Sequence, residues 1–147
     1  MKEFAKPSIE EIKKKLTDLQ FQVTQNAGTE RAFHNEYWNN SEPGIYVDIV
    51  TGQPLFSSKD KFKSGSGWPS FTRPISADLL KEIEDRTLGM NRIETKSVLG
   101  NTHLGHLFYD GPKSEGGRRY CMNSASLKFV PKSKMVEMGY EDYIELV

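Results

Sequence analysis

The second half of the chain alternates short apolar stretches with glycine-containing turns, and this alternation limits the folds that are open to it. Four strands are predicted from their β-branched and aromatic content, over residues 91–98, 103–109, 118–123 and 126–130. Glycine-containing turns break the chain between the first three of them. Strands that follow one another without a crossover helix pair antiparallel, because a parallel pair needs a long connection. The sequence therefore predicts an antiparallel β-sheet system with helices packed around it.

The N-terminal segment carries the signature of a helix start. Ser8 is followed three residues later by Glu11, which is the pattern of a capping box. Apolar residues then recur at helical spacing, at Ile9, Ile12, Leu16 and Leu19. We therefore predict one helix from about residue 8 to residue 20.

The stretch that follows is predicted as an ordered loop and then a strand. Residues 25–43 are rich in Asn, Gly and charge, but they include Phe33, Tyr37 and Trp38, and aromatic residues are uncommon in disordered linkers. Residues 45–49 alternate in the manner of a strand, and residues 51–54 form a turn that ends it.

Two more helices are predicted by their caps. Ser76 is a suitable N-cap for a helix over residues 77–85, in which Leu79, Leu80 and Ile83 form an apolar stripe. A last helix is expected at about residues 132–138, and Gly139 follows it as a left-handed cap.

Length and charge narrow the class of protein. A chain of 147 residues and 16.7 kDa is long enough to bury the core of one domain. The 20 basic and 20 acidic residues give no net charge, which argues against nucleic acid or a membrane surface held by bulk charge. No apolar run approaches the roughly 20 residues that span a bilayer, and the N-terminal residues MKEFAKPSIE lack the apolar core typical of a secretory signal. A cytoplasmic location is expected.

Cys121 is the only cysteine in the chain. An internal disulfide, a CxxC redox pair and a four-cysteine zinc site are therefore excluded. A lone cysteine is more often buried and inert than reactive. On a strand, however, Arg119, Cys121 and Asn123 share one face, and a neighbouring guanidinium favours the thiolate. The pattern fits either an activated nucleophile or an edge strand with a solvated polar face.

Two histidines, His103 and His106, precede this strand. Their spacing places them on opposite faces of an ideal strand, unless a bulge at Gly105 brings them to one side. A metal site is only weakly indicated, because zinc needs a third protein ligand and the remaining histidine, His34, lies in a distant loop. Histidine titrates near neutral pH, so the pair is better read as proton donors beside a cysteine.

A third segment, residues 64–71, holds an indole on a rigid turn. Gly65 and Gly67 permit unusual backbone conformations, and Pro69 fixes the chain after Trp68. Taken alone, Trp68 fits best as a cover for the core from a loop. A phosphate loop is not indicated, because the segment lacks the continuation of a P-loop.

Three motifs carry a resemblance to a known family. They are GWPSF at residues 67–71, HLGHLFYDGP at 103–112 and RYCMNSASLKF at 119–129. In this order they resemble the B-type methionine sulfoxide reductases, which reduce the R epimer of methionine S-oxide in peptides and proteins. The resemblance extends from about residue 23 to residue 140.

The resemblance implies a mainly β fold, with two antiparallel β-sheets and short flanking helices. It implies one domain over residues 1–147, in which residues 1–22 form a helical segment packed on the rest. A monomer is expected, with thioredoxin or a small thiol as the reductant and without a cofactor.

The resemblance also assigns roles to individual residues. Cys121 corresponds to the nucleophile that attacks the sulfoxide sulfur and becomes a sulfenic acid, and Trp68 to the indole that receives the S-methyl group. His103 corresponds to the acid and His106 to a positioning or thiolate-stabilising partner. The remaining expected site residues are Asn123, Arg119, Phe108 and Phe71.

Two departures from the family pattern change the expected behaviour. Many members hold a structural zinc with two CxxC pairs, but the corresponding positions here are Asp48, Thr51, Ser97 and Gly100, so no zinc is expected. Ser66 stands where many relatives have a resolving cysteine. Either this is a natural one-cysteine form or Ser66 is an engineered replacement, and in both cases turnover depends on an external thiol.

Two other classes of function remain open from the sequence. The chain fits a binding module that recognises oxidised methionine on Trp68 without turning it over. A cysteine-dependent acyl-transfer enzyme is a weaker reading, because it needs an oxyanion site as well as a Cys-His pair.

Overall fold

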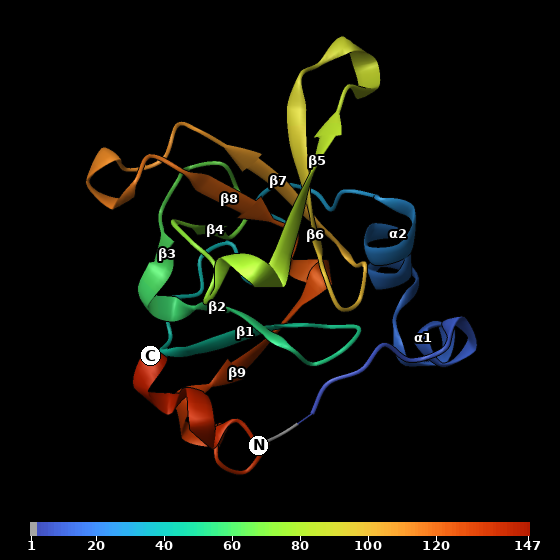
Figure 1. Cartoon of the computed structure of the whole chain (residues 1–147), viewed down its shortest axis with the longest axis vertical. Coiled ribbons are helices and arrows are strands. Elements are labelled where there is room, and N and C mark those ends of the chain that lie inside the picture. Colours follow the sequence, from blue (N-terminus) through green and yellow to red (C-terminus); the bar gives the residue numbers. More distant parts are fainter. Residues whose placement is uncertain (1–2) are drawn as a thin grey trace.

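The structure is a computed structural model that describes residues 3–147; the first two residues of the expected N-terminal segment lie outside the described part. Two antiparallel sheets form its centre (Figure 1). The small sheet has the order β2-β1-β9, with β1 at Gly44–Asp48, β2 at Pro54–Ser57 and β9 at Leu127–Pro131. The large sheet has the order β3-β4-β8-β7-β6-β5. The predicted antiparallel, mainly β fold is thus confirmed.

The strands of the large sheet include three that the sequence predicted to within one residue at each end. These are β6 at Arg92–Ser97, β7 at His103–Phe108 and β8 at Arg119–Met122. The other three are β3 at Lys61–Phe62, β4 at Ser70–Phe71 and β5 at Leu80–Asp85. Short strands such as β3 and β4 have too few residues to show a period in the sequence.

The main core contains side chains from both sheets. Its largest members include Tyr46, Phe56 and Phe71, and the rings of Phe56 and Phe71 stack at 4.3 Å between centroids. Each such side chain contributes about 1.5–3 kcal/mol by leaving water. A second cluster covers the other face of β1, where Ile45 packs with Tyr140 and other C-terminal residues. Both faces of β1 are therefore buried, although its sequence alternates.

The predicted N-terminal helix is two helices, α1 at Ile9–Lys15 and α2 at Asp18–Asn26. Ser8 caps α1 as predicted, with its hydroxyl accepting the Glu11 N–H at 3.2 Å. The single-helix prediction is wrong because Thr17 and Gln20 form a second capping box, which starts α2. The break turns Ile9 and Leu19 outward, and they are 54% and 52% exposed. No helix among residues 3–147 is long and apolar enough to cross a membrane.

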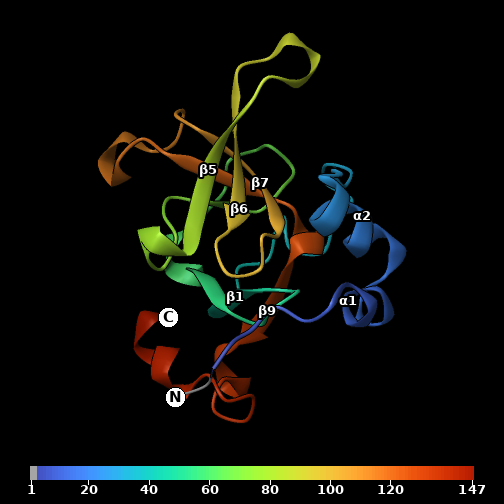
Figure 2. The ribbon, with the colours of Figure 1, turned by 45° about the vertical axis from the view of Figure 1, so that its right-hand side comes forward.

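The helix predicted over residues 77–85 is also wrong. Only one 3₁₀ turn, η2 at Ala77–Leu79, is present, and the chain continues as β5. Every residue of β5 pairs with β6, so tertiary pairing overrides the helical spacing of Leu79, Leu80 and Ile83. Ser76 makes no backbone cap, and its hydroxyl bonds the side chain of Asp78. The β5–β6 hairpin projects from the rest of the molecule (Figure 2).

The C-terminal helix is shorter than predicted. It consists of a 3₁₀ turn, η6 at Lys132–Lys134, followed by turns up to Gly139. Gly139 has φ of 85°, as expected of a left-handed cap. A further 3₁₀ helix, η7 at Glu141–Leu146, contributes Tyr143 and Ile144 to the packing on β1.

Candidate active site

The candidate site lies on the large sheet where β7 and β8 pair. Cys121 of β8 is directly opposite His106 of β7, so the two side chains project from the same face of the sheet. A cavity of about 170 Å³ opens over them. The predicted residues that line it are Ser66, Trp68, His106, Phe108, Arg119, Cys121 and Asn123. The sheet thus assembles nearly all of the expected site.

A bulge in β7 sets the orientation of the two histidines. Thr95 of β6 faces Gly105, but its neighbour Lys96 faces His103, so β7 has one extra residue at this point. The rings of His103 and His106 consequently meet at 5.8 Å, with an angle of 72° between their planes. A side chain at Gly105 would place its Cβ 2.0 Å from the carbonyl oxygen of Cys121. The glycine is needed for the close pairing, and of the two arrangements left open by the sequence the bulged one is present.

His103 is buried and does not line the cavity. Its Nδ1 lies 2.6 Å from a carboxylate oxygen of Glu94 on β6. Its Nε2 has no hydrogen-bond partner among residues 3–147. Burial lowers the pKa of His103, although the Glu94 carboxylate opposes this. Burial therefore favours the neutral form of the ring.

His106 reaches the cavity and is held by a carboxylate from the projecting hairpin. Its Nε2 is 2.7 Å from Oδ2 of Asp85, at the end of β5. Hydrogen bonds from Thr87, followed by that from His106, keep the pKa of Asp85 below its usual range. Asp85 was missed from the sequence because residues 77–85 were assigned to a helix. Glu94 lay in a predicted strand, but the register of that strand against β7 depends on the bulge.

Cys121 is half-buried, and its sulfur has few polar neighbours. The Ser66 hydroxyl lies 3.9 Å from Sγ. Burial raises the pKa of the Cys121 thiol, while the Ser66 hydroxyl and the Arg119 guanidinium oppose the rise. Arg119 therefore acts in the expected direction but is outweighed by burial. Burial therefore favours the protonated thiol over the thiolate.

Arg119 is itself restrained on two sides. Its guanidinium donates to both oxygens of Asp110, at 2.8 and 3.3 Å. Its central carbon lies 4.3 Å from the centroid of the Phe108 ring, which is a cation–π contact. The positive charge of Arg119 is thus held beside Cys121, and the negative charge of Asp110 lies close to both.

Trp68 is fixed by the loop that precedes β1. Its indole N–H donates to the carbonyl oxygen of Glu30 at 3.0 Å. Gly67 has φ of 88°, and a Cβ there would lie 2.8 Å from side-chain atoms of Ala32 and Phe33. The predicted ordered loop is confirmed, and it locks the indole against the cavity.

The Glu30 side chain joins the same loop to the end of β8. Its carboxylate accepts the backbone N–H groups of Ser124 and Ala125, and burial raises its pKa. Asn123 completes this link, since its Oδ1 accepts the Glu30 N–H at 3.1 Å and its Nδ2 donates to the Leu104 carbonyl at 3.1 Å. Asn123 therefore holds the cavity wall. Nothing in the spacing of Glu30 could have indicated this role.

Phe71 requires a correction. It was expected to bind substrate, but its side chain is fully buried in the main core and does not line the cavity. The aromatic wall of the site is formed by Trp68 and Phe108 instead.

The four positions expected in place of zinc ligands converge between β1 and the β6–β7 turn. Asp48 Oδ2 accepts the Ser97 hydroxyl at 2.6 Å. A Cβ at Gly100 would lie 2.9 Å from Asp48 Oδ2 and from the Thr51 methyl group. Within residues 3–147, no three His, Cys, Asp or Glu side chains gather in a way that would hold a metal ion.

The family model described as the SelR domain matches residues 16–131. The matched range contains both sheets and every side chain placed at the cavity above.

Proposed function

Because the chain belongs to the SelR domain family, the methionine-R-sulfoxide reductases, we propose that it reduces the R epimer of methionine S-oxide in peptides and proteins. Membership indicates an oxidoreductase that acts on methionine sulfoxide. The observation that carries the finer proposal is the cross-strand pair of Cys121 and His106 beneath the indole of Trp68. A thiol and an acid then face the same small cavity, and an apolar wall is available for the methyl group.

The proposed reaction transfers oxygen from one sulfur to another. Cys121 Sγ attacks the sulfoxide sulfur while the sulfoxide oxygen accepts a proton. The S–O bond of the substrate breaks, methionine leaves, and the oxygen ends on Cys121 as a sulfenic acid. The substrate sulfur gains two electrons and Cys121 loses two. The proton given to the sulfoxide oxygen becomes the S–OH proton, and the thiol proton passes to the proton donor and restores it.

His106 is proposed as the proton donor in place of His103. His106 lines the cavity, and the ionised Asp85 on its Nε2 orients the ring. His103 is buried outside the lining, and burial lowers its pKa, which disfavours the charged, acidic form of the ring. His103 then supports His106 through their ring contact.

The cycle is proposed to end with an external thiol. The Ser66 hydroxyl lies 3.9 Å from Sγ, and a hydroxyl cannot displace oxygen from a sulfenic acid. Thioredoxin or a small cytoplasmic thiol is the proposed reductant. Mass spectrometry after one equivalent of substrate tests this step, and we expect Cys121 to gain the mass of one oxygen atom.

Absence of zinc is also part of the proposal. The Asp48 carboxylate is already occupied by hydroxyl and backbone donors, and Thr51, Ser97 and Gly100 offer no thiolate. Elemental analysis of the purified protein should find far less than one zinc ion per chain. One equivalent of zinc, retained through dialysis against a chelator, would contradict this.

Separate R and S epimers of one methionine-sulfoxide peptide, incubated with dithiothreitol, test the activity. We expect loss of the R epimer only, and no loss with Cys121→Ser. Tight binding of the R peptide without reduction would favour the alternative of a binding module. Equal activity of the Cys121→Ser protein would contradict the proposed mechanism.

A further inference from the structure

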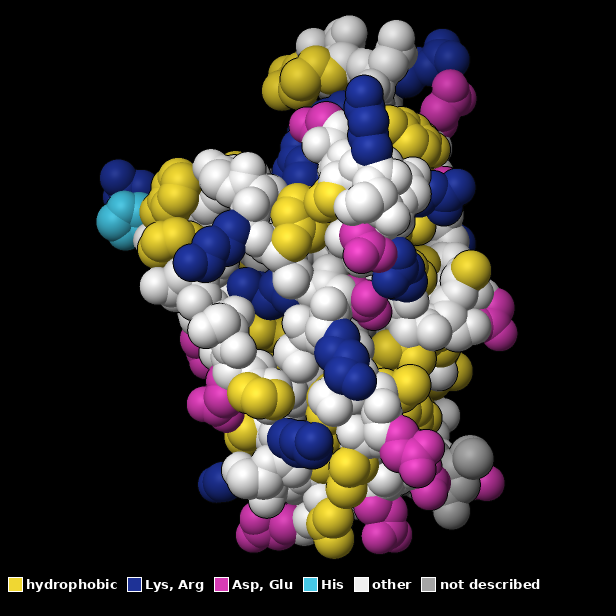
Figure 3. Space-filling model, turned by 90° about the vertical axis from the view of Figure 1, so that its left-hand side faces the viewer, with side chains coloured by type: hydrophobic (Ala, Val, Ile, Leu, Met, Phe, Trp, Pro, Cys, Tyr) yellow, Lys and Arg dark blue, Asp and Glu magenta, His cyan; other side chains and the backbone are white. Residues whose placement is uncertain are grey.

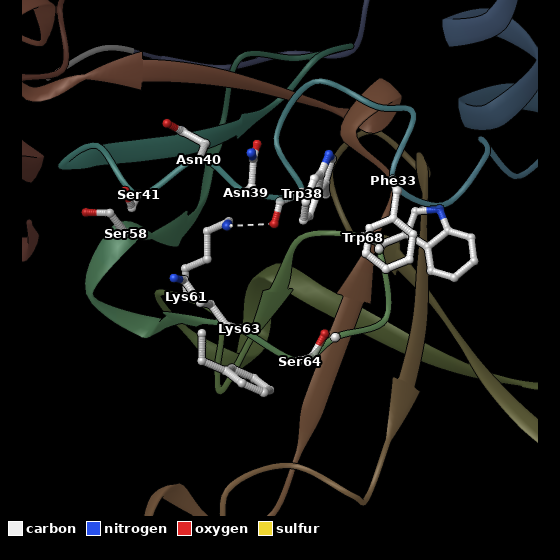
Figure 4. A pocket seen from close by; sticks show the side chains of 13 residues that line it. Phe33, Trp38, Asn39, Asn40, Ser41, Ser58, Lys61, Lys63, Ser64 and Trp68 are labelled. Carbon is white, nitrogen blue, oxygen red and sulfur yellow. Dashed lines mark hydrogen bonds between the residues drawn. The ribbon is translucent and has the colours of Figure 1, made fainter.

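A second, larger groove adjoins the cavity at Trp68. Its volume is about 770 Å³, and Trp68 lines both spaces. In Figure 4 the side chains of Phe33, Trp38 and Lys61 surround the groove, which lies between the loop before β1 and the loop that leads from β3 to Trp68. The groove is therefore a continuation of the candidate site along the surface.

The aromatic side of the groove is held in place by the backbone. The Phe33 N–H donates to the carbonyl oxygen of Gly67 at 2.8 Å. The rings of Phe33 and Trp38 meet edge to face, with centroids 5.0 Å apart. Because the backbone fixes these rings beside Trp68, the groove is already formed without a ligand.

The opposite side carries two lysines without acidic partners. Lys61 and Lys63 both line the groove, and neither forms an ion pair within residues 3–147. The Lys61 ammonium donates only to the Trp38 carbonyl oxygen, at 3.4 Å. The acid next in sequence, Asp60, is paired with Arg73 at 3.0 Å.

The electrostatic surroundings agree with this. Burial, followed by the charge of Lys63, lowers the pKa of Lys61, and no acidic side chain counters the shift. Figure 3 views the molecule from the side that carries β3 in Figure 1; lysine and arginine side chains are spread over the middle of this face, and most acidic ones lie nearer its edges. The two lysines would therefore attract a negatively charged group bound in the groove.

We propose that the groove binds the part of the oxidised polypeptide next to the methionine sulfoxide, and that it selects segments with an Asp or Glu there. This proposal rests on the proposed function. Trp68 lines both the cavity and the groove, so a polypeptide with its sulfoxide over Cys121 can continue past this indole into the groove. A space of this size suits several side chains, since pockets for small ligands span about 300–1,000 Å³.

The experiment uses a set of peptides with a central methionine-R-sulfoxide. Each peptide carries Asp, Asn or Lys at one position, and the set covers successive positions on both sides of the sulfoxide. We measure kcat/KM at low ionic strength with dithiothreitol as the reductant. At one or more positions we expect Asp to be preferred over Lys by about fivefold, the size of a partly exposed charge pair. Added salt should reduce the preference.

The matched variants reverse the charge of one lysine inside the groove and one outside it. Lys63→Glu should reverse the preference, and Lys61→Gln should weaken it. Lys128→Glu, at an exposed position on β9, should leave the preference as in the parent. Thermal melts establish that each variant is folded.

The outcomes separate this proposal from the proposed function. If the parent reduces no peptide, the proposed function fails, and the charge preference is then read from peptide binding to Cys121→Ser by tryptophan fluorescence. Equal kcat/KM, or equal binding, for the Asp and Lys peptides at every position overturns the groove proposal. It is also overturned if Lys63→Glu changes only the KM for a reduced thioredoxin, because the groove then receives the reductant.

Discussion

The Asp48 cluster and the Cys121 site are both built from polar side chains between strands, but they differ in what they leave unpaired. Asp48 accepts hydrogen bonds from the Val50 N–H at 2.9 Å, the Ser97 hydroxyl at 2.6 Å and the Thr102 hydroxyl at 3.0 Å. At the Cys121 site, His103 Nε2 has no partner among residues 3–147, and the sulfur has a hydroxyl only at 3.9 Å.

The contrast shows how one fold separates stability from chemistry. Buried polar groups are nearly always paired, and an unpaired one costs about 1–3 kcal/mol. The Asp48 cluster avoids this cost, so its only effect is to join β1 to the β6–β7 turn. The Cys121 site accepts the cost at His103 Nε2, and its thiol faces a cavity that a substrate can fill. Variants in the two regions should therefore affect different measurements.

The largest effect is expected on stability, from Asp48→Ala. The change leaves the Ser97 and Thr102 hydroxyls and the Val50 N–H buried without their acceptor. We expect the free energy of unfolding in urea to fall by about 4 kcal/mol. The kcat per folded molecule should stay close to that of the parent.

Asp142→Ala is the matched control, because Asp142 is an exposed aspartate in η7. It should change the free energy of unfolding by less than about 0.5 kcal/mol. If Asp48→Ala unfolds at the same urea concentration as this control, the cluster does not stabilise the fold.

The next largest effect is expected on activity, from His106→Asn. Removal of the proposed proton donor should lower kcat about a hundredfold, which is the lower end for general acid catalysis. The rate at which iodoacetamide alkylates Cys121 should remain close to that of the parent, because alkylation needs no proton donor. Stability should change little, since His106 is not part of the core clusters.

His103→Asn serves as the comparison within the pair. It should lower kcat by a smaller factor, about tenfold, because His103 acts through its contact with His106. A larger loss in His103→Asn than in His106→Asn would return the role of proton donor to His103.

The sequence predicted the part of the fold that rests on local signals. Glycine-containing turns separate β6, β7 and β8 in the sequence, and the bounds of β6 to β9 differ from the prediction by at most one residue. The segment at 77–85 went wrong because its leucines fit a helix as well as a strand, and only pairing with β6 decides between them. Local spacing holds no information about that partner.

The same limit applies to the site. Arg119, Cys121 and Asn123 follow from the two-residue period of one strand, and Gly105 signalled the bulge that unites the histidines. Asp85 and Glu94 could not be found, because they reach the histidines only through the β5–β6–β7 register. Glu30 acts across more than ninety residues of sequence.

A third, smaller effect concerns the reactivity of the thiol and comes from Arg119→Ala. The guanidinium lowers the pKa of Cys121 against the larger effect of burial, so its removal should raise that pKa further. Less thiolate is then present at neutral pH, and alkylation should slow by about tenfold. The alkylation rate of Cys121, plotted against pH, should rise at a higher pH than in the parent.

Arg118→Ala is the control for this change. Arg118 is exposed and precedes Arg119, and its guanidinium donates to the Tyr120 hydroxyl at 3.3 Å. Its alkylation profile should match that of the parent. A shift of the Arg119→Ala profile to lower pH would mean that the arginine does not stabilise the thiolate.

The smallest effect is expected from Asp110→Asn, and its sign is opposite. The Asp110 charge raises the pKa of Cys121, but this aspartate side chain is 66% exposed and water screens it. The amide keeps an oxygen for the Arg119 N–H and removes the charge, so the thiol pKa falls and alkylation at neutral pH should quicken by about twofold. High salt should remove the difference, because exposed charges are screened. A slower reaction, or an increase that salt does not alter, would contradict this account. The contrast would then fail between Asp48, a buried carboxylate that stabilises the fold, and Asp110, an exposed carboxylate that only changes the reactivity of Cys121.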